Sequence, residues 1–211
     1  CIFIALTALS AFYPSRHPEG GTFDTGTLAF MLSASGLVLL MTPGLSFFYG
    51  GMVNSRSIIS TMLQSFVALG IVSLIWYAVG FSLAFGDDIG GIIGNPATFL
   101  FFDNVGLTAH DRIGTSLPFV LFAAFQLKFA IITPALITGS FAERVRFWGY
   151  VIFVCLFTLL IYCPLAHMTW HPDGLLFKMG VLDFAGGTVV HISAGFAALA
   201  GAIFLGRRQS H

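Results

Sequence analysis

Charged residues are scarce in this chain. Only 9% of its 211 residues are Asp, Glu, Lys or Arg, whereas 57% are hydrophobic and the mean hydropathy is +0.92. A soluble domain of this size needs roughly a quarter charged residues to cover its surface. The composition therefore predicts an integral membrane protein whose main solvent is the lipid bilayer. Nine basic residues against nine acidic ones give no reason to expect a nucleic-acid partner.

Cysteine is also rare, and its pattern excludes the usual cysteine chemistries. The chain has three cysteines, Cys1, Cys155 and Cys163, and the last two lie in an apolar run. We interpret these two as packing residues. A metal site would need more nitrogen or sulfur ligands at short spacing, so we expect neither a metal nor another cofactor.

The beginning of the chain differs in character from the rest. Residues 1–12 are apolar but too few to span a bilayer, and small residues lie near their end. We interpret them as the remnant of a signal peptide, the alternative being the end of an upstream helix. A polar loop rich in proline and glycine follows. The expected division is an external segment over 1–26, a membrane domain over 27–208 and a cytoplasmic end over 209–211.

Five long apolar runs follow, each near the length of about 20 residues that a spanning helix needs. Open strands would leave backbone groups unsatisfied in lipid, so we expect an all-α integral membrane fold with five transmembrane helices. An odd number of spans is typical of one unit of an inverted repeat. The expected runs lie near 27–53, 57–85, 116–142, 146–168 and 184–205. In the long loop between the second and third runs, the apolar residues 99–102 suggest a piece that lies on the membrane interface.

The basic residues predict the orientation of these helices. One side of the membrane receives five of the nine basic residues, namely Arg56, Arg144, Arg146, Arg207 and Arg208. The other side carries three basic residues and seven acidic ones. Because Lys and Arg concentrate on the cytoplasmic side, we expect a multi-pass protein of the cell membrane with its N-terminus outside.

Two polar side chains stand out at the last run. His191 lies eight residues after Asp183, which places it about 12 Å into the helix if Asp183 starts it. A histidine at that depth either ties two helices together or lines a pore, where it can accept and return protons. Asp183 sits where a helix cap belongs, or it contributes its charge to a cation site.

Aromatic residues suggest a second feature. Phe125 and Phe129 share a helix face, which is usual for core packing. Trp170 follows the fourth run, as an interfacial residue does, but with an aromatic partner it could hold a small cation by its π face. Phe129 lies deeper than Trp170 by its position in the run, so the two meet only in a funnel-shaped mouth. Lys128, between the two phenylalanines, has no firm explanation.

Five stretches, taken together, resemble a known family. They are 42–51 (TPGLSFFYGG), 125–126 (FQ), 139–144 (GSFAER), 162–170 (YCPLAHMTW) and 183–191 (DFAGGTVVH). In these stretches the chain, from about residue 28 to 208, is similar to the ammonium transporters of the Amt/Rh family. The resemblance implies a channel-like transporter rather than an enzyme. It also implies an eleven-helix fold of two inverted five-helix units, with this chain matching the first.

The same resemblance implies roles for individual residues. Trp170 and Phe129 would form an outer recruitment site for ammonium, which Asp183 shapes without touching the ion. Phe125 and Phe129 would form a gate, and His191 would be the first of two pore histidines. The second histidine and the remaining ligands would belong to the second unit, which this chain does not contain. A homotrimer with one pore per subunit, and a regulatory protein at the cytoplasmic face, are the implied partners.

Two other functions remain open at this point. The same fold fused to a signalling module would be a membrane ammonium sensor, and the sequence beyond residue 211 would distinguish it from a transporter. A structural fragment without activity is the third possibility, because half a pore exposed to lipid should not conduct.

Overall fold

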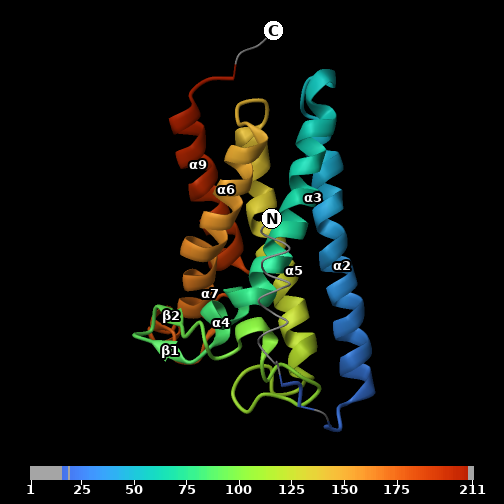
Figure 1. The fold of residues 1–211 in the computed structure, drawn as a ribbon, viewed down its shortest axis with the longest axis vertical. Coiled ribbons are helices and arrows are strands. Elements are labelled where there is room, and N and C mark those ends of the chain that lie inside the picture. The colour runs from blue at the N-terminus through green and yellow to red at the C-terminus, as the bar shows by residue number, and fades with distance from the viewer. Residues whose placement is uncertain (1–15, 19, 209–211) are drawn as a thin grey trace.

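The computed structural model describes residues 16–18 and 20–208, most of which are helical (Figure 1). Long helices run roughly along the long axis of the molecule, and loops gather at one end. Helices α2 (Thr25–Gly50), α3 (Ile58–Ile75), α5 (Phe119–Phe141), α6 (Phe147–Phe157) and α9 (Ser193–Leu205) form the body. Shorter elements are α4 (Phe81–Phe85), α7 (Cys163–Trp170), α8 (Leu175–Lys178) and the antiparallel strands β1 (Asp88–Ile89) and β2 (Ile93–Gly94).

Single π-helical turns join several of these elements into longer rods. Trp76–Gly80 joins α3 to α4, Thr158–Tyr162 joins α6 to α7, and Gly187–Ile192 leads into α9. Short 3-10 turns cover Ser55–Ser57 and Leu100–Phe102. Because a π turn adds a residue to the helical repeat, it rotates the following side chains relative to the preceding ones.

The prediction of five transmembrane helices is confirmed by length and composition. The five candidate spans are Thr25–Gly50, Ser55–Phe85, Phe119–Phe141, Phe147–Lys178 and Gly187–Leu205. Several predicted boundaries differ from the observed ones by two or three residues, and two of these differences bear on the site. The fourth helix does not stop at residue 168, because α7 continues to Trp170. The fifth does not begin at residue 184, because residues 183–186 form a turn before it.

Helix α5 occupies the middle of the bundle. It packs against α2, α3 and α9, while α3 also packs against α6, and α4 packs against α7. An aromatic cluster fills the space where these helices meet the loops. In it Trp76 is fully buried, and its indole N–H donates to the carbonyl oxygen of Ala123 at 3.1 Å. Phe81 lies 5.2 Å from Phe119 between ring centroids. This cluster fixes α5 against α3 and α4.

The long loop 86–118 belongs partly to this core. The sequence suggests that residues 99–102 lie on the membrane surface, but Phe99 and Phe101 are only 6% and 8% exposed. The ring of Phe99 lies 5.1 Å from that of Phe119, and the ring of Phe101 lies 6.0 Å from that of Tyr77. The expectation was wrong because the loop folds back, so these side chains pack against protein instead of lipid.

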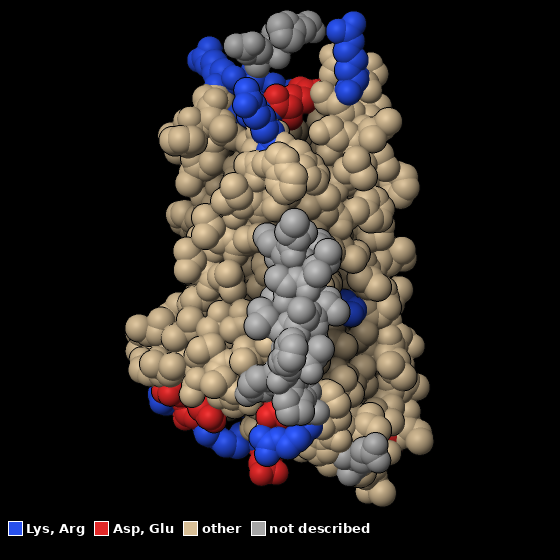
Figure 2. All heavy atoms as spheres, in the orientation of Figure 1, with Lys and Arg blue, Asp and Glu red and all other residues tan. Residues whose placement is uncertain are grey.

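Charged side chains gather at the two ends of the molecule, and the band between them is nearly free of charge on the face shown in Figure 2. We call the end formed by residues 51–57, 142–146 and 206–208 the arginine-rich end. There the carboxylate of Glu143 accepts a hydrogen bond from the backbone N–H of Asn54 at 2.7 Å and pairs with Arg208. The pair with Arg208 lowers the pKa of Glu143. We call the opposite end, formed by residues 86–118 and 171–186, the loop end.

Candidate functional site

A cavity of about 440 Å³ opens at the loop end. Seven of its fifteen lining residues are aromatic, among them Phe125, Phe129 and Trp170. Gln126, Asp183 and Arg112 add polar atoms to this lining. Three segments that are distant in sequence therefore meet here: the first half of α5, the end of α7 with the turn before α9, and the long loop 86–118.

The aromatic residues predicted from the sequence converge in this cavity. Phe125 and Phe129, one turn apart on α5, have ring centroids 4.9 Å apart with the planes at 80°. Trp170, the last residue of α7, has its ring centroid 6.4 Å from that of Phe129 at 68°. None of the three is fully buried. Phe129 and Trp170 thus share one wall of the cavity, as a funnel-shaped mouth requires.

Asp183 positions both Trp170 and the last helix. The indole N–H of Trp170 donates to the backbone oxygen of Asp183 at 3.2 Å. The carboxylate Oδ2 of Asp183 accepts hydrogen bonds from the backbone N–H groups of Thr188 and Val189, both at 2.9 Å. Its Oδ1 is buried and has no hydrogen-bond partner within the described part of the chain. Asp183 therefore supplies a helix cap with one oxygen and an unpartnered acceptor with the other.

The expectation that Asp183 itself occupies the cap position was wrong in register. The residue that precedes the helix is Gly186, whose left-handed backbone (φ 79°) is one that a residue with a side chain rarely adopts. This turn carries the chain back so that the carboxylate of Asp183 reaches the free N–H groups from three residues upstream of Gly186. The loop conformation at 183–186 decides this, and the spacing in the sequence does not reveal it.

His191 lies outside the cavity. It belongs to the π turn Gly187–Ile192, and its backbone N–H donates to the oxygen of Gly186 at 3.0 Å. Its side chain is exposed in this chain and does not line the mouth. Because the helix begins at Gly187, His191 is only four residues, about 6 Å, along it. The earlier depth of about 12 Å was too large because residues 183–186 are not helical.

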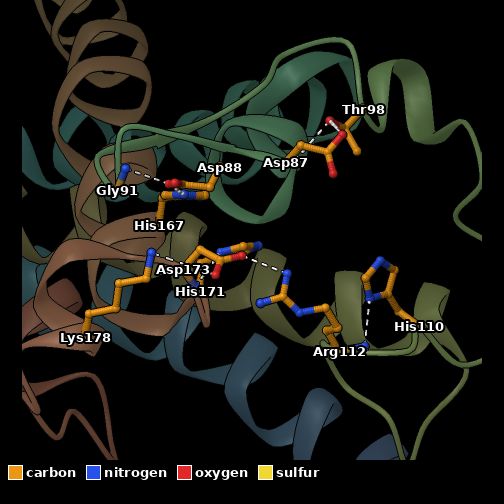
Figure 3. Close-up of polar contacts among 10 residues, drawn as sticks. All are labelled: Asp87, Asp88, Gly91, Thr98, His110, Arg112, His167, His171, Asp173 and Lys178. Atoms are coloured by element: carbon orange, nitrogen blue, oxygen red, sulfur yellow. Dashed lines mark hydrogen bonds and ion pairs between the residues drawn. The ribbon is translucent and has the colours of Figure 1, made fainter.

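A cluster of polar residues lies beside the mouth, and Figure 3 shows its contacts. His167 is fully buried on α7, with Nδ1 3.1 Å from the oxygen of Ala84 and Nε2 3.0 Å from Oδ1 of Asp88. The hydrogen bond with His167 lowers the pKa of Asp88. His171 stacks on His167 with centroids 4.4 Å apart. Within the described ranges, these groups do not form a cluster that could hold a metal ion.

Two cavity residues were missed by sequence reasoning. Gln126 has a buried Oε1 atom that lacks a hydrogen-bond partner among the residues described. Arg112 comes from the long loop and forms an ion pair with Asp173 at 2.8 Å. Gln126 could have been found, because it belongs to a family-like stretch. The position of Arg112 depends on how the loop folds, and no spacing signals it. Lys128 is half-buried on α5, and no ion pair connects it to another described residue.

The arrangement suits a small cation, because aromatic faces attract cations and aromatic side chains line much of the cavity. Among the described residues that line the cavity, none is a nucleophile with an adjacent base.

Comparison with known proteins identifies the class. The family model described as Ammonium Transporter Family matches residues 29–211. An ammonium transporter of Aquifex aeolicus is 47% identical over 202 residues, which cover 95% of this chain and 47% of the relative. An ammonium transporter of Bacillus subtilis is 45% identical over 184 residues, covering 87% of this chain and 45% of the relative. The chain belongs to the ammonium transporter family, whose members are named as transporters and not as enzymes.

Solved structures agree with this assignment. The crystal structure of Saccharomyces cerevisiae Mep2 superposes with a TM-score of 0.74 at 34% identity, covering 88% of this chain and 41% of that one. A structure titled Sensor Amt Protein gives 0.77 at 33% identity, covering 85% and 44%. The chain spans about half the length of the curated relatives it matches, and its five helices correspond to roughly the N-terminal half of the fold.

Proposed function

We propose that the protein moves ammonium or ammonia across the cell membrane, with the cavity at the loop end as the entrance. The observation that carries this proposal is the contact between Phe129 and Trp170, at 6.4 Å between ring centroids, beside Asp183. This is an aromatic corner with an adjacent carboxylate, placed at the end of a membrane helix bundle. Membership of the ammonium transporter family supports the choice of substrate.

The proposed mechanism follows from the cost of moving a charge into an apolar passage. Ammonium loses its hydration shell when it enters, and burying an unpaired ion is strongly unfavourable. Cation–π contacts with Trp170 and Phe129 offset part of this cost, by roughly 0.5–2 kcal/mol per ring. Asp183 shapes this recruitment site. Phe125 and Phe129 then act as the gate, and only neutral ammonia passes it readily.

In this proposal His191 lines the pore and carries the proton that ammonium loses. An imidazole suits this role because one ring nitrogen can accept a proton while the other gives one up. The exposed face of the last helix, which includes Ile192 (52%) and Phe196 (70%), packs against a second set of helices that completes the pore. We further propose that the loop end faces outward, that three copies associate, and that a regulatory protein binds at the arginine-rich end.

Substitution of Trp170 tests the entrance. In the full-length protein, expressed in cells without ammonium uptake of their own, Trp170→Leu should raise the half-saturation concentration for methylammonium. Loss of one cation–π contact predicts an increase of roughly two- to thirtyfold. The maximal rate should change little, because a saturated entrance no longer limits uptake. Initial rates against concentration, normalised to folded protein, provide the measurement.

Trp148→Leu is the matched control. Trp148 lies at the start of α6, at the arginine-rich end, and is 72% exposed, so it has the character of an interfacial tryptophan. Its substitution should affect expression at most and leave the half-saturation concentration alone. If both variants behave alike, or if Trp170→Leu alters only expression, Trp170 is an anchor and not part of a recruitment site.

A sensor is the second candidate function, because one similar structure is titled Sensor Amt Protein and superposes as well as the Mep2 structures do. The fold does not separate the two functions. Uptake and equilibrium binding, measured on the same protein, do separate them. A sensor would bind ammonium with an affinity that depends on Trp170 but would give no saturable flux. A binding signal without flux in the parent protein would therefore favour the sensor.

A further inference from the structure

The rim of the entrance carries a positively charged side chain, that of Arg112. Among the residues that line the cavity, Arg112 and Asp183 are the charged ones. One oxygen of Asp183 is engaged by two backbone N–H groups of the last helix. Arg112 stands at the opening, and its side chain is 58% exposed. A permanent positive charge at the mouth of a cation site would repel the substrate unless another group neutralises it.

Asp173 is the group that does so. Its Oδ2 lies 2.8 Å from Nη1 of Arg112, and its Oδ1 lies 3.8 Å from Nζ of Lys178 (Figure 3). The backbone N–H of Asp173 donates to Nδ1 of His171 at 3.1 Å, and His171 is only 4% exposed. The segment that carries the carboxylate is therefore held from the protein interior. The single carboxylate of Asp173 thus lies between two basic side chains.

Two other acidic groups near Arg112 already have hydrogen-bond partners. Asp88 is bonded to His167, and Asp87 accepts a hydrogen bond from the hydroxyl of Thr98 at 3.0 Å. Both line a separate cavity of about 100 Å³, which Arg112 also borders. If Asp173 were removed, Arg112 would keep its charge at the mouth and lose the carboxylate with which it forms its ion pair. The direction of this electrostatic effect can therefore be predicted.

We propose that Arg112 and Asp173 are specificity-determining residues that set the affinity of the entrance for small monovalent ammonium-type cations. Arg112 lowers this affinity by repulsion, and Asp173 restores it by neutralising Arg112. The proposal rests on the proposed transport function and adds to it an electrostatic control outside the aromatic recruitment site. Removing the negative charge of Asp173 and removing the positive charge of Arg112 should therefore change the affinity in opposite directions. An ion pair with a merely structural role does not predict opposite changes.

A charge cycle tests this. Asp173→Asn, Arg112→Gln and the double variant are made in the full-length protein, and methylammonium uptake is measured against concentration at low ionic strength. Asp173→Asn should raise the half-saturation concentration and Arg112→Gln should lower it, each by roughly two- to tenfold for charges separated by a cavity's width. The double variant should lie near the parent. At high salt all these shifts should shrink, because exposed charges are screened.

The control is Asp103→Asn. Asp103 forms an ion pair of the same kind with Arg16, at 2.9 Å, on the same end of the molecule but away from the cavity lining. Its loss should leave the half-saturation concentration unchanged. Shifts of both single variants in one direction, or no shift in either, would overturn the proposal. If the parent protein shows no uptake, or if Trp170→Leu leaves the half-saturation concentration unchanged, the proposed function is overturned instead, and this inference with it.

Discussion

At the scale of single residues, the backbone conformation around His191 determines on which side of the chain its imidazole lies. It lies in a π turn, where the N–H groups of Val190 and His191 both donate to the oxygen of Gly186, at 2.9 and 3.0 Å. A π turn is less stable than an α turn and often marks a functional position. This local irregularity presents the imidazole on the exposed side of the chain, where the proposed pore would run.

Two substitutions of His191 separate proton transfer from a helix tie. His191→Ala should lower the rate of ammonium uptake by at least about tenfold, because a positioned proton carrier is lost. His191→Gln keeps hydrogen-bonding ability but cannot carry a proton at neutral pH. If His191 carries protons, Gln should fail as Ala does. Recovery of the parent rate in the Gln variant, with equal amounts of folded protein, would instead assign His191 to a tie between helices.

At the scale of elements, the contact between α5 and α9 depends on one glycine. A methyl group at Gly201 would overlap the ring of Phe141, whereas one at Gly195, on the same helix, would meet nothing within 4 Å. Small residues allow membrane helices to approach closely. Which glycine of α9 makes the close contact with α5 depends on how α9 is rotated about its axis.

Gly201→Val should therefore destabilise the bundle. Overpacking at a filled contact costs roughly 1–3 kcal/mol, which should appear as a lower thermal unfolding midpoint in detergent. Gly195→Val is the matched control on the same helix: its side chain meets nothing within this chain, so a loss there would report on the proposed second set of helices instead. Equal losses in the two variants would show that α9 is packed as tightly on the side of Gly195, and the contact with Phe141 would then not be the decisive one.

At the scale of the whole molecule, the charges at the two ends predict the orientation in the membrane. The arginine-rich end gathers the side chains that the positive-inside rule assigns to the cytoplasm, and the entrance lies at the opposite end (Figure 2). The proposed direction of uptake, from outside to inside, depends on this assignment.

Cysteine labelling tests the orientation. With the native cysteines replaced, Arg56→Cys should resist an impermeant thiol reagent applied to intact cells, and Leu107→Cys should react with it. Both positions are exposed in the structure, so accessibility does not bias the comparison. Reaction at position 56 together with protection at position 107 would reverse the topology. The entrance would then face the cytoplasm.

Much of the site could be predicted from the sequence because it lies in family-like stretches on regular helices. Phe125 and Phe129 are one turn apart on α5, and helical geometry alone places them together. Trp170 and Asp183 were identified as candidates for the same reason. Arg112 and Asp173 were not, because a loop–loop ion pair between residues 61 positions apart depends on the paths of both loops. Periodicity carries no information about such paths.

The sequence by itself determined the solvent, the number of spans and the family. These follow from the scarcity of charge, the length of the apolar runs and the order of the motifs, which are all local properties of the chain. The tertiary structure decided where the last helix begins, which loop aromatics are buried and which charges surround the entrance. The last two features arise from long-range contacts, such as the packing of Phe99 on Phe119 and the ion pair of Arg112 with Asp173. The start of the last helix depends on the left-handed turn at Gly186, which lets the Asp183 carboxylate reach the N–H groups of Thr188 and Val189.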